Sequence, residues 1–195
     1  MELSDGPVRK KRRTYDIPGH AHELTFSCYH SRPYLRSERA CRWMVSAVEQ
    51  ARRTHGLQLW AFVFMPTHVH LLLFRPPRDG PLGVPAVLKS IKQSVSKRAS
   101  AWVRANTPER LKTFEVDNGK GGRAFRFWQD GGGYDRNIYT PQAAWHSIRY
   151  IHWNPVEMGL CDRPEDWRWS SARWFAKRDD AVLACDPRPV RMDAR

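Results

Sequence analysis

Two apolar runs separated by a single turn constrain the fold of this chain more than any other feature. The first, residues 57–65, is rich in aromatic and β-branched side chains and is bounded by Gly56 and Pro66. The second, residues 68–74, follows almost at once. Runs of this length and composition are typical of buried strands, and Pro66-Thr67 is a turn signal. The sequence therefore predicts two adjacent strands joined by that turn.

Apolar side chains at spacings of three and four predict three amphipathic helices elsewhere in the chain. The first begins after Ser37, which can cap it, and stops at Gly56. The second covers residues 88–102. The third begins at Thr140, a capping residue followed by proline, and Pro155 ends or kinks it.

Two further strands complete the pattern. Residues 22–29 alternate apolar and polar positions, and residues 124–129 form a short apolar run before three glycines. Residues 106–123 are polar and indicate a long surface loop. The order strand, helix, strand, strand, helix, strand, helix predicts an α+β fold, a ferredoxin-like antiparallel sheet with helices on one face.

The limits of this pattern suggest the domain organisation. We expect a basic flexible arm at residues 1–14, a folded domain at residues 15–176 and a C-terminal tail at residues 177–195. Five consecutive basic residues, 9–13, lie in the arm. They could contact phosphates or belong to a solvated tail.

Charge favours a polyanionic partner. The chain has 33 Lys and Arg against 20 Asp and Glu, a formal net charge of +13. Contacts between such residues and nucleic-acid phosphates release counterions, which favours binding. Net charge bears on what a protein associates with and says nothing of its fold. A soluble protein that is basic without a specific polyanionic partner would have the same composition.

Cysteine spacing and hydropathy point to the cytoplasm. The four cysteines contain no CxxC pair, so zinc-finger spacing is absent and free thiols are expected. No apolar stretch approaches the roughly 20 residues of a membrane span. The first residues also lack the apolar core of a secretory signal.

The motif His68-Val69-His70 is the sharpest chemical signal. On a strand, side chains two positions apart share a face, so two imidazoles can converge on one divalent cation while Val69 points toward the core. Two surface histidines that happen to alternate would give the same short pattern.

Tyr150 and Asn154 form a second signal. On the third predicted helix they lie four positions apart and therefore on one face. The amide oxygen of Asn154 is a hard ligand acceptable to Mg²⁺ or Mn²⁺. A tyrosine ring packed on the sheet, with an asparagine capping the helix, would also explain the pair.

Together these segments resemble the REP-associated tyrosine transposases, a branch of the single-tyrosine HUH transposases. The resemblance covers residues 15–176. It is carried by the segments FMPTHVH (residues 64–70), FWQ (127–129), YIHWNPVEMGL (150–160) and PEDWRWSSA (164–172).

The resemblance implies an HUH endonuclease/transposase fold and a function. It implies that His68, His70 and Asn154 hold a divalent metal, Mg²⁺ or Mn²⁺, and that Tyr150 is the nucleophile. It also implies single-stranded DNA with hairpins as the substrate, cut and rejoined through a 5′-phosphotyrosine. A bacterial, nucleoid-associated protein that acts as a monomer or homodimer is expected.

Other residues compete for roles in such a site. His146 lies four positions before Tyr150 and could position the phenol or touch a phosphate, whereas we expect His152 to pack or contact DNA. Tyr134 and Tyr139 are alternative nucleophiles without a polar partner one helical turn later. The glycine run 131–133 reads as a flexible turn and departs from the family in detail.

DNA is expected to be held by backbone contacts and by stacking on aromatic side chains. The basic candidates are Lys89, Lys92, Lys97, Arg98, Arg123 and Arg126, each of which could equally lie on a solvated face.

Two other functions remain open from the sequence. One is a catalytically inactive, domesticated DNA-hairpin-binding protein with the same fold. The other is a plasmid-type replication initiator or relaxase, although 195 residues leave no room for a fused helicase domain.

Overall fold

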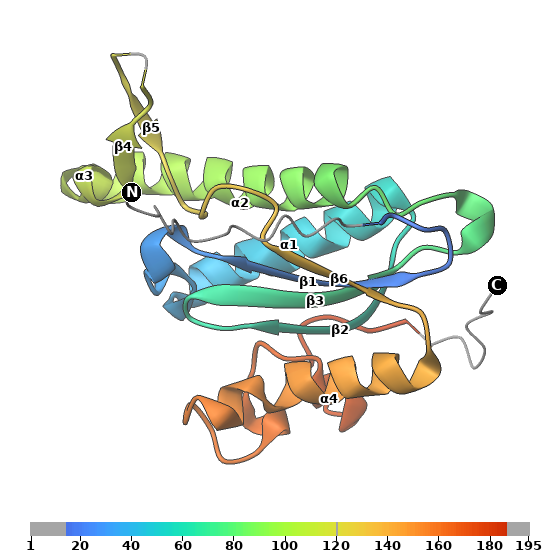
Figure 1. The fold of residues 1–195 in the computed structure, drawn as a ribbon. Coiled ribbons are helices and arrows are strands. Elements are labelled where there is room, and N and C mark those ends of the chain that lie inside the picture. Colours follow the sequence, from blue (N-terminus) through green and yellow to red (C-terminus); the bar gives the residue numbers. More distant parts are fainter. Residues whose placement is uncertain (1–14, 120, 187–195) are drawn as a thin grey trace, which may run out of the picture.

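A computed structural model describes residues 15–119 and 121–186 of the chain (Figure 1). Its main sheet has the strand order β2-β3-β1-β6, with every neighbouring pair antiparallel. The strands are β1 (Ala21–Ser27), β2 (Gln58–Phe64), β3 (His68–Phe74) and β6 (Tyr134–Ile138). This order is the ferredoxin-like one, so the predicted α+β class is confirmed.

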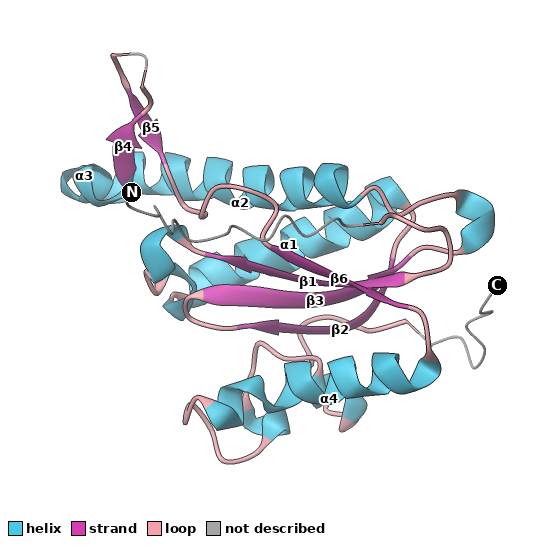
Figure 2. Ribbon diagram, in the orientation of Figure 1, coloured by secondary structure: helices cyan, strands magenta, loops and turns pink. Residues whose placement is uncertain are grey.

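Helices cover both faces of this sheet. The helices are α1 (Glu38–His55), α2 (Val84–Asn106), α4 (Pro141–Glu157) and two single turns, α3 (Leu111–Phe114) and α5 (Ala172–Phe175). Short 3-10 helices lie at Tyr29–Ser31, Tyr34–Arg36, Pro77–Asp79, Pro108–Arg110 and Pro164–Asp166. Helices α1 and α2 lie on one side of the sheet and α4 on the other (Figures 1 and 2).

The prediction of helices on one face is therefore wrong. Its physical reason lies in β3, where Leu71 and Leu73 pack in the core under α1 and α2, while Leu72 and Phe74 pack in the core under α4. A strand buried on both faces reads as a continuous apolar run, and such a run does not show how many helices cover each face.

The fourth strand of the main sheet is β6, and the strand predicted at residues 124–129 is found only in part. Residues 124 and 125 belong to β5 (Arg123–Phe125), which pairs with β4 (Glu115–Asp117) in a separate two-stranded ribbon, and Trp128 forms an isolated β-bridge with Cys28 just after β1. Strand β6 is polar because it is an edge strand that pairs only with β1 and has a single buried residue, Ile138. It therefore lacks the apolar alternation that marks a strand.

The loop before β6 is held tightly at its last glycine. Gly133 has φ +78, and a Cβ built there would lie 2.2 Å from the carbonyl oxygen of Thr25 in β1. Lys92 donates hydrogen bonds to the carbonyl oxygens of Gln129 and Gly131, the latter at 2.8 Å. Gly133 is thus the site of a close approach of two backbones, whereas a Cβ built at Gly131 or Gly132 would meet no atom within 4 Å.

Of the predicted helix-end signals, Gly56 and Thr140 act as expected, whereas Ser37 precedes α1 without a side-chain capping hydrogen bond and Pro155 does not end α4. Gly56 ends α1 in the left-handed conformation, and the Thr140 side chain accepts a hydrogen bond from the Ala143 amide at the start of α4. Pro155 lies inside α4, which continues to Glu157. The missing N–H of proline removes one hydrogen bond near the helix end, and the helix stops within a turn of it.

The folded domain reaches further than residue 176. Leu183 and Cys185 are buried in the core under α1 and α2. The Asp186 carboxylate accepts hydrogen bonds from the Leu59 amide and the Arg52 guanidinium, both at 2.7 Å. Residues 177–186 therefore belong to the domain. The predicted basic arm at residues 1–14 lies outside the described residues.

Three of the four cysteines, Cys28, Cys41 and Cys185, are buried in the core under α1 and α2. None of the four cysteines, all of which lie among the described residues, forms a disulfide, and burial raises the pKa of Cys28 and of Cys41 to about 12. Among the described residues, no helix combines the length and apolar character needed to cross a membrane.

The close approach at Gly133 gives the first test. Gly133→Ala should lower the free energy of unfolding by at least about 2 kcal/mol, because a methyl group would meet the Thr25 carbonyl and the residue would keep a left-handed backbone. The matched control is Gly132→Ala, where an added Cβ meets no atom within 4 Å. Urea unfolding of both variants measures the difference, and equal stabilities would contradict the tight approach.

Candidate active site

The two histidines of β3 lie on the sheet face that α4 covers. His68 and His70 alternate with Val69, which is fully buried in the opposite core, as the sequence predicts. The His68 and His70 rings have centroids 4.9 Å apart. His70 is only 4% exposed, while His68 is half-buried. The strand thus presents two adjacent imidazoles to one space.

The ring of His70 is fixed by its neighbour on β1. Its Nδ1 forms a 2.9 Å hydrogen bond with the Thr25 hydroxyl, and its Nε2 is buried without a hydrogen-bond partner. If Nδ1 carries the proton and donates it to Thr25, the Nε2 lone pair is left free. A buried lone pair without a partner costs free energy, and a metal ion is one partner that would satisfy it.

Tyr150 projects from α4 toward the same space. Its ring centroid lies 5.5 Å from that of His70, with the ring planes at 89°. Ile148 and Ile151 anchor this part of α4 in the core, and Tyr150 stands at the margin of that buried face with 46% of its surface exposed. A phenol in this position is accessible to a macromolecular substrate.

Asn154 lies one helical turn after Tyr150 and is 6% exposed. Its side chain forms a hydrogen bond with His68, which partly offsets the effect of burial on that histidine. The structure therefore brings all four predicted site residues, His68, His70, Tyr150 and Asn154, to one place between β3 and α4.

Burial favours the neutral form of both imidazoles. Desolvation lowers the pKa of His68, and desolvation together with the neighbouring His68 lowers the pKa of His70 to about 3. Neutral imidazoles are metal ligands. Among the described residues, no three His, Cys, Asp or Glu side chains are grouped so that they could hold a metal ion, and the Asn154 amide oxygen is the third ligand that the sequence predicts.

A pocket of about 510 Å³ opens beside these residues. It is lined by Glu23, Thr25, His70, Tyr134, Arg136, His146 and Tyr150. Glu23, Thr25 and Arg136 were not predicted from the sequence. They come from β1 and β6, and a polar residue on a strand gives no local signal that it faces a site on another element.

The other histidines and tyrosines considered for the site fall into two groups, one that lines the pocket and one that does not. His146 and Tyr134 line the pocket with Tyr150. Tyr139 lies outside it, with its ring centroid 5.5 Å from that of His20. His152 packs on Phe175 and forms a 2.8 Å hydrogen bond with Ser171, in line with the packing role expected for it.

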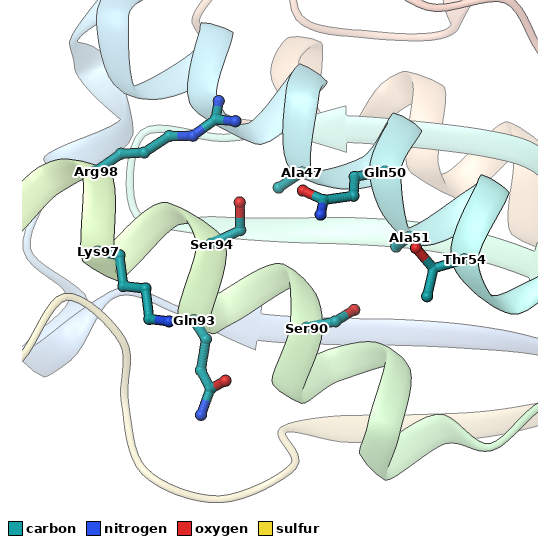
Figure 3. Close-up of a pocket in the computed structure, with 9 residues that line it drawn as sticks. All are labelled: Ala47, Gln50, Ala51, Thr54, Ser90, Gln93, Ser94, Lys97 and Arg98. Atoms are coloured by element: carbon teal, nitrogen blue, oxygen red, sulfur yellow. The ribbon is translucent and has the colours of Figure 1, made fainter.

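The basic candidates lie away from the pocket. Lys89, Lys92, Lys97 and Arg98 belong to α2, which lies on the opposite side of the sheet from α4, the helix that carries Tyr150 (Figure 1). Lys92 is hydrogen-bonded to the glycine loop, and Lys97 and Arg98 line a separate pocket between α2 and α1 (Figure 3). Arg123 pairs with Glu115 at 3.6 Å, and Arg126 pairs with Asp130.

Comparison with known proteins identifies the fold. The structure is similar to that of a REP-associated tyrosine transposase bound to a REP hairpin, with a TM-score of 0.67 over 95% of this chain and 97% of that chain, at 19% sequence identity. A provisionally assigned transposase from Deinococcus radiodurans R1 covers 74% of this chain and 96% of its own, also at 19% identity, but its TM-score of 0.41 is too low to establish a common fold. No protein-family model and no curated protein matches the sequence.

The neutral, buried state of His70 predicts a pH dependence of stability. In metal-free buffer, the free energy of unfolding should fall as the pH is lowered from 6.5 toward 4. The unfolded chain takes up a proton at His70 near the ordinary pKa of 6.5, whereas the folded chain resists until about 3. In this pH window the unfolded state therefore binds more protons than the folded state. The free energy of unfolding should fall by up to about 1.4 kcal/mol for each pH unit.

The slope of the free energy of unfolding against pH isolates the contribution of His70. His70→Gln should make the fall shallower, because the substituted side chain does not titrate. Ile148→Val removes a methyl group from the same core, so it should lower stability by about 1 kcal/mol at every pH and keep the original slope. Urea unfolding at several pH values measures both. An unchanged slope in His70→Gln would show that His70 is not held neutral.

Proposed function

We propose that this protein is a transposase-type DNA nickase and strand transferase that acts on hairpin-containing single-stranded DNA. In this proposal Tyr150 is the nucleophile, and His68, His70 and Asn154 hold a divalent cation, Mg²⁺ or Mn²⁺. One observation carries it: the half-exposed phenol of Tyr150 lies beside a buried imidazole whose Nε2 has no partner.

The residues present fit a hard divalent cation. Two neutral imidazoles and an amide oxygen make a site with three ligands from the chain, which leaves positions for substrate oxygens. Thr25 would orient His70 by accepting its Nδ1 proton in a hydrogen bond, the kind of supporting contact that metal-binding histidines commonly have. When bound there, the cation would supply positive charge next to the scissile phosphate.

Tyrosine chemistry accounts for both cutting and joining. The Tyr150 oxygen would attack the phosphorus, forming a P–O bond to the phenol and breaking the bond to the 3′ oxygen. The phenol gives up its proton and the departing 3′ oxygen gains one, leaving a 5′-phosphotyrosine and a free 3′-hydroxyl. One phosphoester replaces another, so a 3′-hydroxyl can later reverse the step without ATP.

Several features support DNA as the partner. The structural neighbour with the same fold is bound to a REP hairpin. The net charge of +13 favours a polyanion, and the exposed aromatic side chains of Trp145 and Trp153 on α4 could stack on bases. We propose that the protein works at the bacterial nucleoid, as a monomer or homodimer.

Replacement of the nucleophile tests the reaction. Tyr150→Phe should reduce cleavage of a hairpin-bearing single strand by more than about a thousandfold, because the attacking oxygen is lost. Binding of the same strand should change by less than about threefold, because the phenyl ring remains. A denaturing gel that resolves protein linked to 5′-phosphate measures the covalent product, and a filter assay measures binding.

Two other tyrosines provide the controls. Tyr139→Phe, outside the pocket, should form the covalent product as the unmodified protein does. Tyr134 lines the pocket, so it is the rival nucleophile. Covalent product that persists in Tyr150→Phe and disappears in Tyr134→Phe would transfer the role to Tyr134. Binding without cleavage by the unmodified protein would support the inactive hairpin-binding alternative.

The metal site has its own test. Mn²⁺ binding, followed by electron paramagnetic resonance, should weaken by at least about tenfold in His70→Gln and in Asn154→Ala, because each loses a ligand. His55→Gln, on α1 at the far side of the sheet, should bind Mn²⁺ as before. Cleavage should stop in EDTA and return with Mg²⁺ or Mn²⁺. Full cleavage in EDTA would remove the metal from the mechanism.

A further inference from the structure

Arg136 is held in the wall of the Tyr150 pocket by two buried partners. Its Nη2 donates to the Glu23 carboxylate at 2.6 Å and to the Ser147 hydroxyl at 2.8 Å. Ser147 in turn donates to the same Glu23 oxygen at 2.9 Å. Glu23 is 3% exposed and Ser147 is fully buried, whereas the Arg136 side chain is 46% exposed. One end of the guanidinium is therefore fixed and the rest is accessible.

This anchoring leaves most of the guanidinium unused. Arginine has five N–H donors, and the two printed contacts use only Nη2. Nη1 and Nε make no hydrogen bond to the described residues. A buried carboxylate requires a charged partner, so Glu23 explains why an arginine is present at position 136. An arginine needed only for Glu23 would not have to be half-exposed in the pocket that Tyr150 lines.

Strand register places Arg136 close to the reacting groups. Thr25 pairs with His70 on one side and with Tyr134 on the other, and Glu23 pairs with Arg136 one row further along the same face. Successive rows on one face lie about 7 Å apart. Both rows face α4, where Ser147 and Tyr150 are three positions apart and hence neighbours. Arg136 and His70 thus flank Tyr150.

We infer that Arg136 binds a backbone phosphate of the DNA strand next to the phosphate that Tyr150 attacks; this rests on the proposed function of the site. A guanidinium matches phosphate oxygens with two parallel hydrogen bonds, and its fork needs little reordering when one nitrogen is already anchored. Through this contact the strand is held on the β6 side of the pocket while the scissile phosphate lies at the histidines.

Binding is measured without cleavage, so that this contact is separated from the reaction. All proteins carry Tyr150→Phe, and the probe is an oligonucleotide with a hairpin and a single-stranded flank, selected as the tightest binder from a randomised pool. Arg136→Gln should weaken binding about tenfold and reduce the slope of log K against log salt by about 0.7, the value for one phosphate contact on a single strand. Arg53→Gln, on an exposed position of α1, is the matched control and should change neither quantity.

Neutral linkages identify the phosphate. A methylphosphonate placed at each linkage of the flank in turn should weaken binding about tenfold at one position in the protein that retains Arg136. At that position the neutral linkage should add no further loss in Arg136→Gln. Absence of any coupled position, or coupling to a base substitution instead, would overturn the assignment.

A further variant separates the effect of Arg136 on DNA binding from its effect on the stability of the buried Glu23 carboxylate. Arg136→Gln leaves Glu23 without its charged partner, which can destabilise the fold. The double variant Glu23→Gln/Arg136→Gln removes both charges and should recover stability while binding stays weak. Recovery of binding together with stability would show that Arg136 acts only on the fold. Cleavage by a protein with Tyr150→Phe would reject the proposed nucleophile and leave the binding result interpretable.

Discussion

The packing of α4 against the histidine-bearing face of β3 is the contact on which the candidate site depends. Ala144, Ile148 and Ile151 bury one side of the helix against apolar side chains of the sheet. This burial fixes the rotation of α4 about its axis, and the rotation decides where its polar residues stand. Tyr150 falls at the margin of the buried side, and Asn154 falls one turn later at the level of His68. The apolar contacts therefore position the polar ones.

Burial also sets the chemistry of the imidazoles. An exposed histidine pair would take up protons a little below neutral pH, whereas desolvation lowers the pKa of both His68 and His70. Thr25 occupies the Nδ1 side of His70 and leaves Nε2 toward the site. The same sheet that supplies the ligands thus supplies the medium that keeps them unprotonated and the neighbour that orients them.

The parts of the site that could be predicted from the sequence are those with a local pattern. His68 and His70 alternate about a core valine, and Tyr150 and Asn154 are one helical turn apart, so each pair is visible within five residues. Glu23 meets Arg136 and Ser147 only through strand pairing and helix packing, across more than a hundred positions in each case. Strand β6 was not predicted because an edge strand needs few apolar residues. The second helical layer was not predicted because the consecutive apolar residues of β2 and β3 do not show how many helices cover each face.

The crossing of Gly133 over the Thr25 carbonyl has a consequence for how such chains can change in evolution. Side chains alternate along β6, so Arg136 faces α4. Asp135, which is hydrogen-bonded to His22, faces the side of the sheet that α1 and α2 cover. One residue added or removed between Gln129 and Tyr134 would turn the strand over, presenting a carboxylate to the pocket and burying a guanidinium in the opposite core. We therefore expect the length of this loop to tolerate change less than its composition, even though it lies on the surface.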